Sequence, residues 1–96
     1  MDLADVRTDL SNLLVEAQVA AQLPGAHPSL PAVVDWLGAM QRLFARGDPA
    51  PIVLRKESSG IYRFISNDPA FAASPMGRKV LALAAAMRAV AKVELG

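Results

Sequence analysis

The sequence predicts a small α+β domain in which three main helices and one β-hairpin follow one another in the order α-α-β-β-α. Three observations support this fold class: helical periodicity over the first 45 residues, a β-favouring composition over residues 51–66, and an alanine-rich periodic segment from about residue 75 to 94. The chain has 96 residues and contains no internal repeat, low-complexity tract or flexible linker. We therefore expect a single domain over residues 1–96.

The first helix is expected from about residue 3 to residue 22. Asp2 and Asp5 have the spacing of an N-cap and an acidic first turn, which favour the positive end of a helix. Leu23-Pro24-Gly25 ends it, because the residue before a proline is pushed out of the helical region. The residues of its apolar stripe recur at spacings of three and four: Leu3, Val6, Leu10, Leu13, Leu14 and Ala17.

A second helix follows a short connector that holds the only histidine, His27. We predict a loop role for this histidine, because no cysteine and no local carboxylate accompanies it. Ser29 is the predicted N-cap, and Arg46-Gly47-Asp48 the predicted C-terminal end. Trp36 and Leu43 lie on the flank of the apolar stripe and widen it, so this helix should be covered on two sides. The stripe itself consists of Leu30, Val33, Val34, Leu37, Met40 and Phe44.

Residues 51–66 are predicted to form a β-hairpin, because β-branched and aromatic residues flank a turn at 57–60 that ends in glycine. The preferred register places Val53 opposite Phe64 and Arg55 opposite Tyr62; a three-residue loop with a bulge is the alternative. A two-stranded ribbon is marginally stable in water. We therefore expect helices, a second subunit or both to cover it.

Two further N-caps are predicted after this segment. Asp68 is expected to cap a single helical turn that holds Phe71, and Ser74, followed by a proline, should begin a long helix that runs to about residue 94.

The sequence contains few of the motifs that would predict a catalytic or cofactor site. The absence of cysteine excludes disulfides and thiolate metal sites, and the six glycines form no phosphate-binding loop. No spacing of His and carboxylate residues matches a metal site, so neither a metal nor another cofactor is expected, and enzymatic activity is not expected either. The longest apolar runs are too short to span a membrane and the chain begins with acidic residues, so we expect a cytoplasmic protein with no membrane partner.

The leading functional hypothesis is a non-enzymatic protein-interaction module of the adaptor, regulator or inhibitor type, most simply a homodimer. The composition, rich in Ala, Arg, Val, Leu and Pro, is typical of a GC-rich bacterial genome. The hypothesis depends on the expected need of the ribbon for cover and on the wide apolar arc of the second helix. The residues predicted to bind a protein partner are Trp36, Met40, Leu43, Val53 and Phe64.

The alternative hypothesis is nucleic-acid binding, because the charge is unevenly distributed. Residues 1–35 hold one arginine against five carboxylates, whereas residues 36–96 hold nine Lys or Arg against four. The predicted hairpin carries cationic and hydroxyl side chains, which in other proteins contact the phosphate groups of nucleic acids. This basic hairpin resembles the wing of winged-helix DNA-binding domains over residues 50–66, although only two long helices precede it here. The predicted nucleic-acid contacts are Arg55, Lys56, Tyr62 and Arg63.

Overall fold

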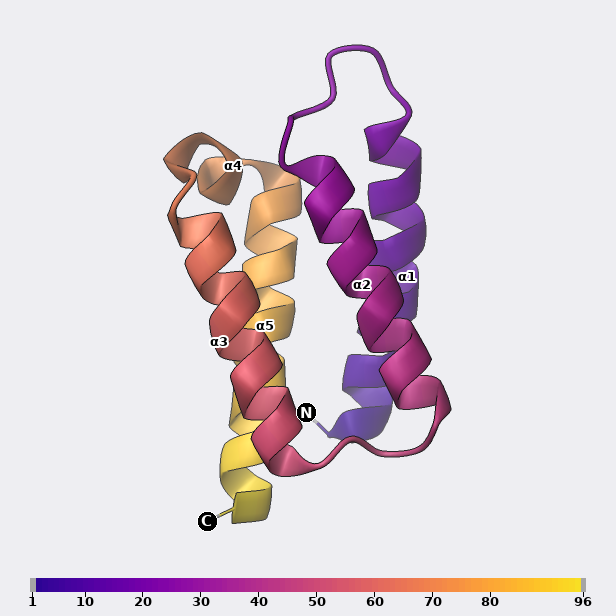
Figure 1. Cartoon of the computed structure of the whole chain (residues 1–96), viewed down its shortest axis with the longest axis vertical. Helices are drawn as coiled ribbons and strands as arrows, with labels where there is room; N and C mark the ends of the chain where they lie inside the picture. The colour runs from indigo at the N-terminus through magenta and orange to yellow at the C-terminus, as the bar shows by residue number, and fades with distance from the viewer. Residues whose placement is uncertain (1, 96) are drawn as a thin grey trace.

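The computed structural model describes the backbone of residues 2–95 and the side chains of residues 2–93, and it contains helices only (Figure 1). The predicted α+β class is therefore wrong, since no strand occurs in the described chain. The helices, in order, are α1 (Leu3–Ala21), α2 (Leu30–Ala45), α3 (Pro51–Ser66), α4 (Pro69–Ala73) and α5 (Pro75–Leu95).

Helix α3 replaces the predicted hairpin. Its first turn begins with Pro51, whose missing N–H is not needed at that position. The residues that α3 buries are Leu54, Ser58, Ile61 and Ile65, at spacings of four, three and four, which is the period of a helix. The predicted strand pairs of Val53 with Phe64 and of Arg55 with Tyr62 are also wrong, because all four residues belong to this one helix.

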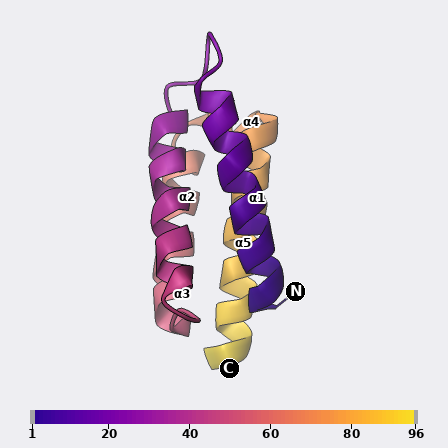
Figure 2. The same cartoon turned by 90° about the vertical axis from the view of Figure 1, so that its right-hand side faces the viewer.

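The helices form two antiparallel pairs that pack on each other (Figures 1 and 2). Helix α1 packs on α2, helix α3 packs on α5, and α1 contacts α5 between the pairs. The short α4 closes one end of the bundle, and both chain termini lie at the other end (Figure 1). The largest fully buried side chains come from all five helices: Leu10, Leu37, Phe44, Leu54, Ile65, Phe71 and Met87.

Several predicted helix ends are confirmed. Asp2 and Asp5 form a reciprocal capping box, in which each carboxylate accepts the other residue's backbone N–H. Gly47 follows α2 with a φ of 125°, a conformation that glycine adopts without steric cost. Asp68 caps α4, and the Ser74 hydroxyl accepts the Gly77 N–H at the start of α5. Local signals therefore predicted these boundaries correctly.

The apolar side of α3 is covered within the chain, because its buried stripe faces the bundle interior and α3 packs along α5. The argument for a second subunit from an uncovered ribbon therefore does not hold. The homodimer remains a prediction that depends on the surface residues alone.

Candidate functional site

The main candidate site is a positively charged surface formed by α3 and α5, which we call the basic face. Its cations are all exposed: Arg55, Lys56 and Arg63 on α3, and Arg88 and Lys92 on α5. Among the side chains that the structure describes, no carboxylate lies within 4.0 Å of any of them, whereas Arg7 and Lys79 elsewhere have ion-pair partners.

Helical spacing places the α3 residues of the basic face together. Lys56 and Arg63 are seven residues apart, as are Arg55 and Tyr62, so the members of each pair project from the same side of the helix. Ser59 lies between them on the side next to α5. Its hydroxyl oxygen accepts a hydrogen bond from the guanidinium of Arg88, which joins the α5 cations to those of α3.

Tyr62 lies among these cations with 55% of its surface exposed. Its hydroxyl forms no hydrogen bond with the described residues, so its phenol ring is available on the surface of the bundle. All four residues predicted from the sequence to contact nucleic acid are thus brought to one surface. They reach it on a helix and not on a wing. Sequence reasoning missed Arg88 and Lys92 as members of this surface; the helical period of the buried residues of α3 was the signal that would have located them.

A second candidate surface is a shallow groove between α2 and α3. It is lined by Ala32, Trp36, Glu57, Gly60, Ile61 and Phe64. The indole Nε1–H of Trp36 donates to Glu57 Oε2 at 3.2 Å, which connects the two walls.

Only two of the five residues predicted to bind a protein partner line this groove. Trp36 and Phe64 line it, and Phe64 is 41% exposed. Leu43 and Val53 are half-buried on α2 and α3. Met40 belongs to the core, where only 4% of its surface is accessible.

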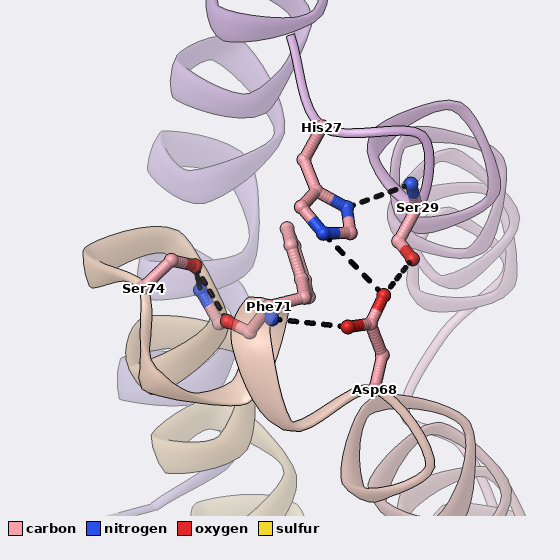
Figure 3. A network of polar contacts seen from close by, with 6 residues as sticks. His27, Ser29, Asp68, Phe71 and Ser74 are labelled. Atoms are coloured by element: carbon pink, nitrogen blue, oxygen red, sulfur yellow. Dashed lines mark hydrogen bonds and ion pairs between the residues drawn. The ribbon is translucent and has the colours of Figure 1, made fainter.

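A polar cluster joins His27 and Ser29 to Asp68 (Figure 3). We call it the inter-hairpin tie, because it links the antiparallel helix pair α1–α2 to the antiparallel helix pair α3–α5. The Ser29 hydroxyl donates to Asp68 Oδ2 at 2.8 Å, and His27 Nε2 lies 3.5 Å from the same oxygen. The other carboxylate oxygen, Oδ1, accepts the backbone N–H of Phe71. No local pattern predicts this contact, because Asp68 is distant in the chain from His27.

The tie contains Ser, His and Asp but not the connectivity of a catalytic triad. A serine nucleophile requires its hydroxyl to be hydrogen-bonded to the imidazole, whereas the Ser29 hydroxyl donates to the carboxylate. The imidazole Nδ1 instead accepts the Ser29 backbone N–H at 3.0 Å, which places the proton of the neutral ring on Nε2, facing Asp68. The cluster therefore joins the two helical pairs and does not activate a serine.

Hydrogen bonding lowers the pKa of Asp68 below its ordinary value of 3.8. The largest cause is the Ser29 hydroxyl, followed by the Phe71 backbone N–H, and the charge of His27 adds to them. These contacts favour the ionised carboxylate at neutral pH.

Comparisons of the chain with protein-family models, with curated proteins and with solved structures found no match. Among the described residues, no group of three or more His, Asp or Glu side chains is placed to hold a metal ion. No helix in this part of the chain combines the length and the apolar character needed to cross a membrane.

Proposed function

We propose that the protein binds nucleic acid through the basic face. The observation that carries the proposal is the grouping of five exposed cations on two adjacent helices, with no described carboxylate in ion-pair distance. Lys and Arg side chains that neutralise phosphates release condensed counterions, so such a surface binds a polyanion without a preformed pocket. The hydroxyls of Ser59 and Tyr62 supply hydrogen-bonding groups suited to phosphate and sugar.

The composition of the basic face favours a phosphate backbone over a lipid surface. Three of the five cations are arginines, whose planar guanidinium pairs with two phosphate oxygens at once. A helix that lies on a membrane instead needs an exposed apolar stripe. The apolar stripe of α3 is buried within the bundle and cannot enter a lipid layer without unfolding, and its exposed apolar side chains, Ile52 and Phe64, lie twelve residues apart and form no continuous stripe.

The proposal predicts that replacing Arg55 and Arg63 together by glutamine weakens DNA binding. Each lost phosphate contact should make the dependence of log K on log salt shallower by about 0.9 for duplex DNA. For the wild-type protein, affinity should fall about 150- to 500-fold between about 50 and 200 mM salt if four or five phosphates are contacted. Fluorescence anisotropy of a labelled oligonucleotide, titrated at several salt concentrations, measures both quantities.

The matched control replaces Arg42 and Arg46 by glutamine, because these exposed arginines belong to α2 and its C-terminus and removing them changes the net charge equally. The control should keep most of the wild-type affinity and its salt dependence. Equal losses in the two double variants would mean that net charge alone attracts DNA. A wild-type protein that binds no oligonucleotide at low salt would refute the proposal.

Binding of a protein partner, most simply a second copy of the chain, is a second candidate function. The observation that favours it is the groove between α2 and α3, where Trp36 and the exposed Phe64 offer apolar surface. Sedimentation velocity should show a concentration-dependent dimer that Phe64→Glu dissociates. Val19→Glu is the control, because Val19 is an exposed apolar residue on α1, outside the groove. A monomer at every concentration would remove the dimer.

A further inference from the structure

The shape of the basic face limits how it can meet a nucleic acid. Helix α3 packs along α5, so the cations lie on the outer sides of two adjacent helices. A single helix fits the major groove of B-DNA, which is about 12 Å wide. Two packed helices present a surface about 20 Å wide, because each helix with its side chains is about 10 Å across. The basic face as a whole is therefore broader than the groove and cannot enter it with the cations of both helices.

Tyr62 supplies a different kind of base contact. Its ring is exposed on the same side of α3 as Arg55, seven residues away, and next to Arg63 in the chain. Proteins that bind single strands combine cations along the backbone with aromatic rings on which unpaired bases stack. In a duplex each base is stacked between its neighbours, so no base face is free to stack on a tyrosine that lies on a broad protein surface.

Arg88 and Ser59 extend this arrangement across the two helices. Their hydrogen bond holds the guanidinium beside α3, one turn of the helix from Tyr62. Along the axis of α3, Tyr62 lies about 10 Å from Arg55 and only about 1.5 Å from Arg63, so Arg63 is directly beside the ring and Arg55 is two turns away. A strand that follows the basic face from Arg55 towards Arg63 would meet the cations of both helices before the position where a base can stack, and Arg63 at that position.

We infer that the ligand of the basic face is single-stranded nucleic acid, with Tyr62 stacking on one base while Arg55, Arg63 and Arg88 contact the flanking phosphates. This inference rests on the proposed function, because it assumes that the basic face binds nucleic acid. It adds a preference for unpaired bases and assigns that preference to one side chain.

The test compares a labelled single-stranded oligothymidylate with a duplex of the same length, using the full chain and the variants Tyr62→Ala and Tyr62→Phe. The wild-type protein should bind the single strand about tenfold more tightly than the duplex. Tyr62→Ala should lose about tenfold in affinity for the single strand and leave the duplex affinity unchanged. Tyr62→Phe keeps the ring and should retain the preference. Circular dichroism shows whether each variant is folded.

The outcomes separate the inference from the proposed function. Equal affinity for both oligonucleotides, with no effect of Tyr62→Ala but a clear effect of the Arg55 and Arg63 substitutions, would refute stacking and leave nucleic-acid binding intact. Absence of binding to either oligonucleotide would refute both. Tighter binding to vesicles containing anionic lipid, or to an acidic polypeptide, than to the single strand would also overturn the inference, because neither ligand offers bases.

Discussion

Replacing Gly77 by alanine is expected to lower the free energy of unfolding by about 3 kcal/mol, the upper part of the range for overpacked sites. A Cβ at this position would lie 1.9 Å from the backbone oxygen of Phe71 and 2.8 Å from its carbonyl carbon. Backbone atoms cannot rotate out of the way as a flexible side chain can. Helix α4 would have to move away from α5, and Phe71, which is 1% exposed, would lose part of its packing.

Gly60→Ala is the matched control for this substitution. Gly60 also lies inside a helix, but no heavy atom lies within 4 Å of the position that its Cβ would take. Alanine should therefore stabilise α3 by about 0.5–1 kcal/mol through the lower backbone entropy of the unfolded chain. Urea unfolding followed by circular dichroism measures both effects. A Gly77→Ala variant as stable as the wild type would contradict the close approach of α4 to α5.

Asp68→Ala is expected to destabilise the protein more than Ser74→Ala does. Ser74 accepts one N–H at the start of α5, and loss of such a cap costs about 1 kcal/mol. Asp68 caps α4 and also accepts the Ser29 hydroxyl and faces His27, so its removal breaks contacts to three residues. Unfolding midpoints of the two variants, measured under the same conditions, decide between them. Equal losses would show that the inter-hairpin tie adds nothing to the cap.

The same carboxylate should make stability depend on acid pH. The pKa of Asp68 is lowered in the folded protein. The ionised carboxylate therefore adds its full contribution to the free energy of unfolding at pH values above its ordinary pKa of 3.8. This contribution is lost as the pH falls through the lower, folded-state pKa. Asp68→Asn keeps a side chain that can cap α4 but removes the titration, so its stability should fall less over this range. An Asn variant with an unchanged acid dependence would exclude Asp68 as a cause.

The candidate surfaces could be predicted only in part. Residue type predicted that Arg55, Lys56, Tyr62 and Arg63 contact nucleic acid, and the structure places these four residues on one surface, although their contact with a ligand remains a prediction. The predicted arrangement on a β-hairpin was wrong, because these residues lie on helix α3, where Ser59 accepts a hydrogen bond from Arg88 of α5. The inter-hairpin tie was not predictable, since a contact between two distant loops leaves no periodic pattern.

Local signals in the sequence predicted the ends of four of the five helices, because caps, prolines and glycines act on the backbone within a few residues. These signals correctly located α1, α2, α4 and α5. The conformation of residues 51–66 was decided by the tertiary structure. This segment contains Gly, Ser and β-branched residues, which are poor helix formers. Packing of Leu54, Ile61 and Ile65 into the bundle core outweighs that weak preference and selects the helix.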